Sequence, residues 1–294
     1  MHDHSHHHSS DAGSNNIAVA FFLNLGFSVI EFVGGYLTNS TAIMADAVHD
    51  LGDSLSIGLA WILDRVGRRE ANSTFTYGYQ RFSLFGALIN SVILVAGSVW
   101  VLTEAIPRLF DPVMPVAEGM VGLAILGVAV NGYAALRLSK GKSLNERALN
   151  WHLLEDVLGW AAVLVVAVVL LFVDWPILDP LLSIAFTLFI LVNVVKMLWE
   201  TLRIFAQSSP DAQLAERIES ALTGMAEISR IHDLRLWSLD GEHHVMSVHV
   251  EMHTTLSSEQ QVALKAAISR SLAPFQLAHT TVELEWPEEA CRHL

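Results

Sequence analysis

Six long apolar segments dominate the sequence and limit the folds that the chain can adopt. They cover approximately residues 17–37, 42–64, 82–106, 116–138, 148–173 and 177–205. A helix needs about 20 predominantly apolar residues to cross a bilayer, and each segment reaches or approaches that length. The composition agrees, because 52% of the residues are hydrophobic and only 16% are charged. The sequence therefore predicts a polytopic α-helical membrane protein with six transmembrane helices.

The basic residues of the short connections predict how these helices are oriented. Four lie between the second and third segments, and four lie at the end of the fourth segment or between it and the fifth: Arg65, Arg68, Arg69, Arg81, Arg137, Lys140, Lys142 and Arg147. The connections on the opposite side hold Arg108 alone. Basic loops stay in the cytoplasm, so both termini are expected there. The first 16 residues lack the basic start and apolar core of a cleavable signal, so the first segment is expected to be retained.

The composition changes after residue 206, where a small cytoplasmic domain is predicted. Residues 210–225 and 257–275 have helical apolar spacing, and residues 230–239, 243–252 and 279–286 alternate like strands. This αββαβ order predicts a ferredoxin-like α+β domain over residues 207–294, behind a transmembrane domain over 17–206. From residue 208 onward, 13 acidic residues face 6 Lys and Arg. This acidity argues against nucleic acid or an anionic membrane surface as a partner.

Two of the predicted spans contain histidine and aspartate four residues apart. Ionisable residues inside a span are costly and usually functional, and residues four apart share one helix face. In the second span both His49–Asp53 and Asp46–Asp50 meet this condition, and spacing alone does not choose between them. The fifth span repeats the His-x-x-x-Asp pattern at His152 and Asp156. Two imidazoles and two carboxylates suit a tetrahedral zinc site; the alternative is polar side chains that stabilise the bundle without a metal.

Several stretches together resemble the cation diffusion facilitator family of divalent-metal transporters, in particular its zinc or cobalt–zinc–cadmium branch. They are "ADAVHDLGD" (45–53), "FTYGYQRFS" (75–83), the His152/Asp156 pair, "IHDLRLWSL" (231–239) and "HTTVELE" (279–285). The resemblance implies Zn²⁺ efflux, with His49, Asp53, His152 and Asp156 as ligands of the transported ion and His49 favouring zinc. It also implies a homodimer in a bacterial inner membrane, and no organic cofactor.

The resemblance leaves some residues with open roles. Asp46 matches a position to which the family assigns a structural role. Asp50, Glu155 and Trp160 differ from the residues that the family usually has at their positions. Asp50 and Glu155 are candidates for an outer shell around the metal, and Glu155 is also a candidate ligand. A solvated or bundle-facing Glu155 is the alternative.

Metal binding outside the membrane is a further expectation. The resemblance places a regulatory zinc site at His232, His249, Glu283 and Glu285, although polar residues also alternate along any half-buried strand. His243 and His244 fall at a turn and are expected to be exposed, and Cys291 is expected to be a lone thiol. Residues 1–16 begin with a histidine-rich run that is either a disordered metal-collecting tail or a tag.

The ligand chemistry predicts that zinc leaves in exchange for protons. Zinc binds neutral imidazole and ionised carboxylate, so loading of the site must expel protons that the empty site holds. Free histidine titrates near about pH 6.5, close to the pH on either side of a bacterial membrane.

Two other classes of protein are less consistent with the sequence. An intramembrane zinc hydrolase would need an open coordination position and a His-Glu-x-x-His motif, and a metal sensor does not explain ligands buried in six spans.

Overall fold

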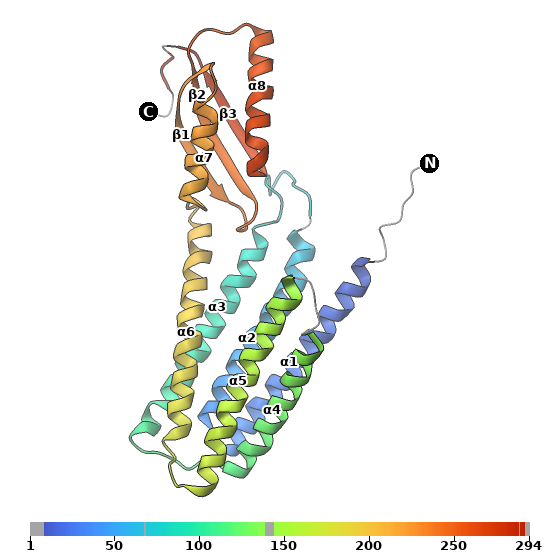
Figure 1. Cartoon of the computed structure of the whole chain (residues 1–294), viewed down its shortest axis with the longest axis vertical. Helices are drawn as coiled ribbons and strands as arrows, with labels where there is room; N and C mark the ends of the chain where they lie inside the picture. The colour runs from blue at the N-terminus through green and yellow to red at the C-terminus, as the bar shows by residue number, and fades with distance from the viewer. Residues whose placement is uncertain (1–8, 68, 139–143, 288, 292–294) are drawn as a thin grey trace. The chain divides into compact units, whose positions relative to one another are not determined.

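The computed structural model describes residues 9–67, 69–138, 144–287 and 289–291 (Figure 1). Within these ranges, the side chains of residues 9–20, 23, 60, 61, 64 and 137–152 are not described. The chain forms two compact units, one made of Met1–Ile62 with Gly86–Leu198 and the other of Leu63–Phe85 with Trp199–Leu294. The histidine-rich run at residues 1–8 lies outside the described residues.

Six long helices follow one another where the six spans were predicted. They are α1 (Ser9–Thr38), α2 (Thr41–Gly67), α3 (Phe82–Ala105), α4 (Ala117–Leu138), α5 (Leu144–Phe172) and α6 (Leu178–Phe205). Among the described residues, the helical stretches Phe82–Leu109, Ala117–Leu136, Leu153–Phe172 and Leu178–Phe205 are long and apolar enough to cross a membrane by length and composition. Helix α2 carries four aspartates, at positions 46, 50, 53 and 64, which lower its apolar character. The prediction of a helical transmembrane domain is confirmed.

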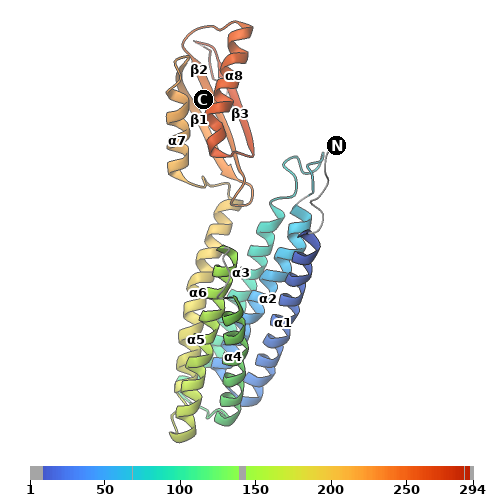
Figure 2. The ribbon, with the colours of Figure 1, turned by 45° about the vertical axis from the view of Figure 1, so that its right-hand side comes forward.

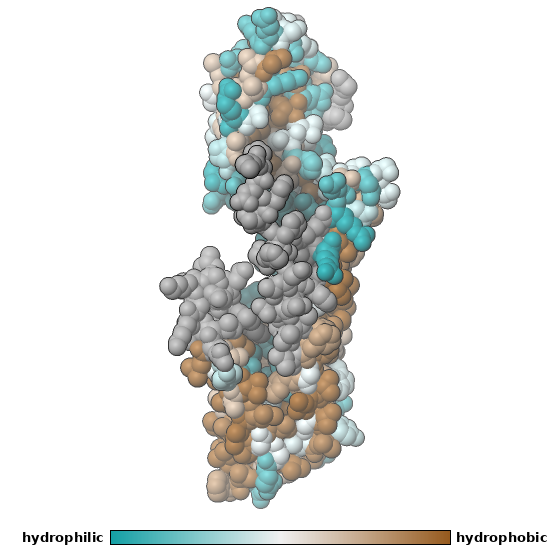
Figure 3. All heavy atoms as spheres, turned by 90° about the vertical axis from the view of Figure 1, so that its right-hand side faces the viewer, coloured by the Kyte–Doolittle hydropathy of each residue, from teal (hydrophilic) through white to brown (hydrophobic). Residues whose placement is uncertain are grey.

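The outer surface of these helices is apolar. Large side chains point outward from several of them, including Tyr36, Leu136, Leu158, Phe172 and Phe189. Figure 3 shows hydrophobic side chains covering much of the visible face of this part of the chain. Lipid tails are as apolar as these side chains, so this surface suits a bilayer and is costly in water.

Close packing between α4 and α5 depends on a glycine. Trp160 of α5 is fully buried, and its indole lies against Gly127 of α4 and edge-on to Phe27 of α1, 6.1 Å between ring centroids. A Cβ atom at Gly127 would overlap the indole ring. Trp160, which departs from the family pattern, therefore fills the interior of the helical unit.

The C-terminal part of the chain is the predicted αββαβ domain. It contains α7 (Ala212–Thr223), β1 (Ile228–Ser238), β2 (His244–Met252), α8 (Ser258–Leu272) and β3 (His279–Glu285). The sheet order is β1-β2-β3, with β1 antiparallel and β3 parallel to β2 (Figure 2). The side chain of Asp211 caps α7, and Ser257 with Gln260 forms a capping box at α8.

One face of this sheet is covered by the two helices. Each helix buries three apolar residues spaced four apart, Leu214, Ile218 and Leu222 on α7 and Leu264, Ile268 and Leu272 on α8. They pack on alternate residues of the strands, such as Met246, Val248 and Val250 of β2. Since strand side chains alternate between faces, His249 of β2 points to the opposite face of the sheet. The strands thus hold the candidate ligands away from the apolar core.

Candidate metal centres

Helices α2 and α5 border one cavity of about 320 Å³ in the helical unit. His49 of α2 and Asp156 of α5 both line it, together with Asp46 and Glu155. The Nε2 atom of His49 lies 3.7 Å from the Oδ2 atom of Asp53, one helical turn further along α2. The cavity therefore brings together members of the two His-x-x-x-Asp pairs.

Helices α2 and α5 approach one another near Asp46 and His49. Gly159 of α5 faces Asp46, since a Cβ atom there would lie 3.8 Å from the Asp46 carboxylate, and Asp156 shares the cavity with His49. The His152 side chain lies outside the described residues, so its place relative to Asp53 stays a prediction. Hydropathy alone puts the two motifs at different depths, but α2 continues to Gly67 and α5 begins at Leu144, beyond the predicted spans.

Three buried carboxylates from α1 and α2 form a cluster beside this cavity. Glu31, Asp46 and Asp50 each offer an oxygen atom within 4.8 Å of the other two, and all three residues are buried. Asp46 belongs to both the cluster and the cavity lining. Glu31 is not among the site residues predicted above. The sequence nevertheless marks this residue, because Glu31 is the one charged residue in the apolar segment 17–37.

Glu155 also lines the cavity, although its side chain is exposed. Its exposure agrees with the alternative of a solvated carboxylate, and its outer-shell role stays a prediction. Asp50 is buried within the carboxylate cluster, and its backbone oxygen accepts hydrogen bonds from Asn24 and Ser54.

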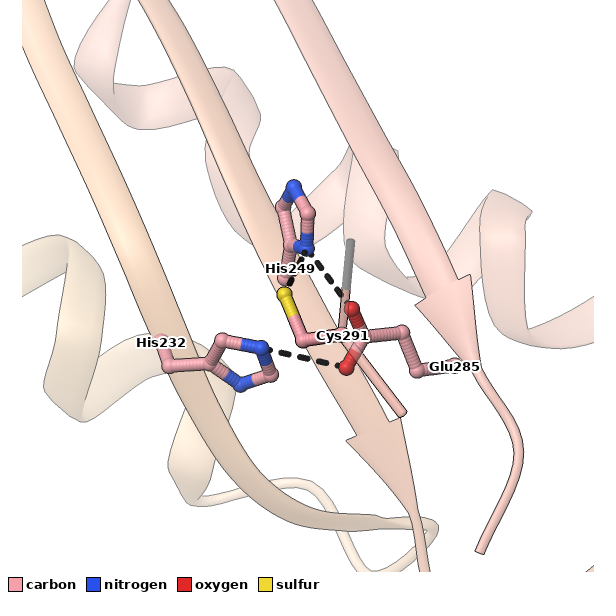
Figure 4. A group of neighbouring side chains, drawn as sticks. All are labelled: His232, His249, Glu285 and Cys291. Carbon is pink, nitrogen blue, oxygen red and sulfur yellow. Dashed lines mark hydrogen bonds and ion pairs between the residues drawn. The ribbon is translucent and has the colours of Figure 1, made fainter. Parts of the chain in front are cut away.

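A second group of candidate metal ligands lies on the face of the C-terminal sheet opposite its two helices (Figure 4). His232 of β1, His249 of β2, Glu285 of β3 and Cys291 each offer one ligand atom, and these atoms lie within 4.8 Å of one another. Nδ1 of His249 is 2.7 Å from Oε1 of Glu285, and Nε2 of His232 is 3.1 Å from Oε2 of the same carboxylate. We refer to these four residues as the cytoplasmic ligand cluster.

The electrostatics of the cytoplasmic ligand cluster favour an ionised carboxylate. Burial alone would raise the pKa of Glu285, but hydrogen bonds from His249 and Cys291 and the charges of the two histidines outweigh it, so the pKa is lowered. The other ring nitrogen of His249, Nε2, faces Glu283 at 3.7 Å and Asp233 at 3.8 Å. Glu283 therefore lies outside the cluster and faces the opposite side of the imidazole.

The two histidines at the β1–β2 turn differ from one another. His243 is exposed, as expected, and its ring contacts Asp240 at 2.6 Å. His244 is half-buried, and its Nδ1 atom is buried without a hydrogen-bond partner. Neither residue belongs to the cytoplasmic ligand cluster.

Comparison with known proteins decides the family. Residues 17–206 match the model of the cation efflux transmembrane domain, and residues 210–285 match that of the cation efflux protein cytoplasmic domain. The chain belongs to the cation diffusion facilitator family. Cation diffusion facilitators are membrane transporters, so the prediction of a metal-efflux transporter rather than an enzyme is confirmed.

Similar proteins in bacteria cover almost the whole chain. A cadmium, cobalt and zinc/H(+)-K(+) antiporter of Bacillus subtilis is 29% identical, covering 95% of this chain and 91% of its own. The zinc transporter ZitB of Shigella flexneri is 30% identical over 96% of this chain and 92% of its own. The metal cation efflux system protein CzcD of Cupriavidus metallidurans is 28% identical, and the match covers 96% of this chain and 89% of that protein. This cation diffusion facilitator is therefore similar to metal-efflux proteins along almost its whole length.

Proposed function

We propose that this protein exports Zn²⁺ from the cytoplasm in exchange for protons, across a bacterial inner membrane and with both termini in the cytoplasm. The observation that carries the proposal is the shared cavity, which His49 of α2 and Asp156 of α5 both line. Asp53, one turn from His49, and His152, one turn from Asp156, complete the proposed ligand set. The name of the similar zinc transporter supports zinc as the transported ion, and the name of the zinc/H(+)-K(+) antiporter supports an exchange that involves protons.

The donor atoms favour zinc over harder cations. Imidazole nitrogen suits zinc, whereas manganese and magnesium prefer oxygen ligands. Cadmium and cobalt share much of this preference, and the similar antiporter of Bacillus subtilis carries both metals in its name. A broader metal range is therefore the main alternative, and competition by Cd²⁺ and Co²⁺ during zinc uptake measures it.

Proton exchange follows from the charge that the empty site would carry. Two ionised carboxylates without a cation are costly in a low-dielectric interior, so protons replace the metal as it leaves. Zinc binding from the cytoplasm then releases these protons. An inward proton gradient reloads the outward-facing site with protons and drives zinc off.

Zinc flux in everted membrane vesicles or proteoliposomes tests this function. Zinc uptake should follow an imposed pH gradient, and protons should move in the opposite direction. Zinc accumulation against its own gradient that ignores the pH difference would rule out proton exchange. Absence of zinc movement under any gradient would rule out zinc transport itself.

We propose that residues 17–206 carry the ion, while residues 207–294 dimerise and regulate transport through metal bound at His232, His249 and Glu285. The match to the cytoplasmic cation efflux domain and the clustering of these side chains support this division. A chain that ends after residue 206 should be monomeric and should lose the dependence of its rate on cytoplasmic zinc. A truncated dimer with a normal zinc-dependent rate would contradict the regulatory role.

A further inference from the structure

We propose that Cys291 is the fourth ligand of the regulatory metal site, so that metal at the cytoplasmic ligand cluster is bound by two histidines, one glutamate and one thiolate. The proposal deepens the regulatory role proposed above and rests on it only for the consequence of binding. Nothing in the sequence pattern points to this residue, because it lies six positions after Glu285 and beyond the last strand.

A tight turn after β3 brings Cys291 back to the sheet. The backbone nitrogen of Glu289 donates to the carbonyl of Trp286 at 3.1 Å, and the Glu289 carboxylate accepts from the backbone nitrogen of Trp286 at 3.0 Å. The chain thereby reverses, and Sγ of Cys291 lies 3.5 Å from Nδ1 of His249 (Figure 4). The thiol therefore approaches the same ring nitrogen as the Glu285 carboxylate.

The distances within the cytoplasmic ligand cluster are close to those of a tetrahedral zinc site. Zinc bonds of about 2.0–2.3 Å separate neighbouring ligand atoms by about 3.3–3.6 Å. The 3.5 Å between sulfur and nitrogen already fits. The contacts of Glu285 at 3.1 and 2.7 Å must open by about 0.2 and 0.6 Å to reach the lower end of this range. Side-chain rotation accommodates a change of this size without moving the strands.

The surroundings orient the histidines for this role. Nδ1 of His249 points into the cluster, while its Nε2 faces the carboxylates of Asp233 and Glu283. Metal-binding histidines commonly have a carboxylate near the second ring nitrogen, which fixes the ring and raises its basicity. His232 lies beside His249, with 5.3 Å between ring centroids, and its Nδ1 is buried without a hydrogen-bond partner.

A thiolate ligand determines which metals the site accepts and what can block it. Thiolate favours zinc and cadmium and disfavours magnesium and manganese, which are hard cations. With four protein ligands, the site is closed within one copy of the domain, as structural zinc sites are. Metal binding would also fix the segment after β3 to the sheet, and alkylation of the thiol would prevent that binding.

Cobalt(II) spectroscopy on the full chain in detergent tests the proposal directly. The transport site is removed by Asp53→Ala with Asp156→Ala, and the five histidines before residue 9 are replaced by alanine. Cobalt should then give a sulfur-to-cobalt charge-transfer band in the near ultraviolet. Cys291→Ser should lose this band, whereas His243→Ala, a histidine of the same domain outside the cluster, should keep it. An unchanged spectrum in Cys291→Ser would overturn the assignment.

Thiol labelling provides a second readout that leaves the cysteine in place. Cys291 is the single cysteine of the chain, so an alkylating reagent reports on it alone. Saturating Zn²⁺ should slow labelling in the same background, and His249→Ala or Glu285→Gln should remove the protection. Equal labelling rates with and without zinc would refute the proposal. Both measurements use a chain without its transport site, so they are independent of whether zinc is the exported ion.

Discussion

The carboxylate of Asp179, in the first turn of α6, accepts a hydrogen bond of 2.6 Å from the backbone nitrogen of Thr41, the first residue of α2. It also accepts from the Thr41 hydroxyl at 2.8 Å and from the backbone nitrogen of Ala42 at 3.3 Å. A buried carboxylate on one helix thus caps the start of another, where unpaired N–H groups and the helix dipole favour negative charge. This contact fixes the beginning of the helix that carries His49 and Asp53.

Asp179→Ala should destabilise the protein by about 1–3 kcal/mol, because it leaves buried donors at the start of α2 unpaired. The expected result is a lower thermal unfolding temperature of the detergent-solubilised protein. Asp174→Ala removes an exposed aspartate five residues earlier and should have little effect. Equal unfolding temperatures for both variants would contradict the capping role.

Asp53→Ala and Asp156→Ala should each abolish zinc export while the protein still reaches the membrane. Each substitution removes a proposed carboxylate ligand, and the remaining neutral side chain cannot offset the charge of the ion. Zinc resistance of cells, with membrane abundance measured in parallel, checks this prediction. Asp174→Ala again serves as the control. Full transport in either ligand variant would exclude that residue from the site.

His49→Asp should increase the acceptance of Cd²⁺ relative to Zn²⁺. The substitution replaces a nitrogen ligand by oxygen, which removes part of the preference for zinc. Competition between the two ions during uptake gives the ratio of Zn²⁺ transport to Cd²⁺ transport. The control His253→Asp makes the same change at an exposed residue of the C-terminal domain. A Zn/Cd ratio that is the same in His49→Asp and in the unmodified protein would count against His49 as a selectivity residue.

Gly127→Ala should destabilise the helical unit by about 1–3 kcal/mol, because the added methyl group overlaps the buried indole of Trp160. Gly122→Ala on the same helix is the matched control, since a Cβ atom there has no neighbour within 4 Å. The thermal unfolding temperature in detergent should fall for Gly127→Ala and should change little for Gly122→Ala. If the overlap is the cause, Trp160→Leu combined with Gly127→Ala should cost less than the sum of the two single changes.

Asp240 should make the β1–β2 turn sensitive to acid. Burial alone would raise its pKa, but hydrogen bonds from the backbone nitrogens of His243 and Glu242 and from the His243 ring outweigh it and lower the pKa. Because the pKa of Asp240 is lower in the folded chain than in the unfolded chain, the ionised carboxylate stabilises the turn at neutral pH. This stabilisation decreases as the pH falls below the unfolded pKa of about 3.9, and it is lost below the folded pKa.

Amide hydrogen exchange measures the effect in the full chain. Asp240→Asn should speed exchange at residues 242 and 243 near pH 7, relative to the unmodified protein. At a pH well below about 3.9 the difference should shrink, because protonation of Asp240 in the folded chain removes the charge that these hydrogen bonds stabilise. The exposed neighbour variant Glu242→Gln should show no such pH-dependent difference. A difference for Asp240→Asn that is equally large at both pH values would contradict the assignment.

Much of the fold was predictable from sequence because its signals are local. Six apolar segments of bilayer length, and a C-terminal alternation with periods of 3.6 and 2, are properties of neighbouring residues. The His-x-x-x-Asp pairs were predictable for the same reason, since residues four apart share a helix face. His232, His249 and Glu285 were singled out through the family resemblance, on strands that the alternation predicted.

Tertiary structure decided which of these residues meet. Asp179 and Thr41 are 138 positions apart, so their contact has no sequence signal. Glu31 joins Asp46 and Asp50 because α1 packs against α2, and Cys291 joins His249 because the chain reverses after Trp286. The sequence by itself determined the helices, the strands and the residue types able to bind metal. Only packing between distant segments decided the clusters, because contacts between side chains depend on how their backbones approach one another in space.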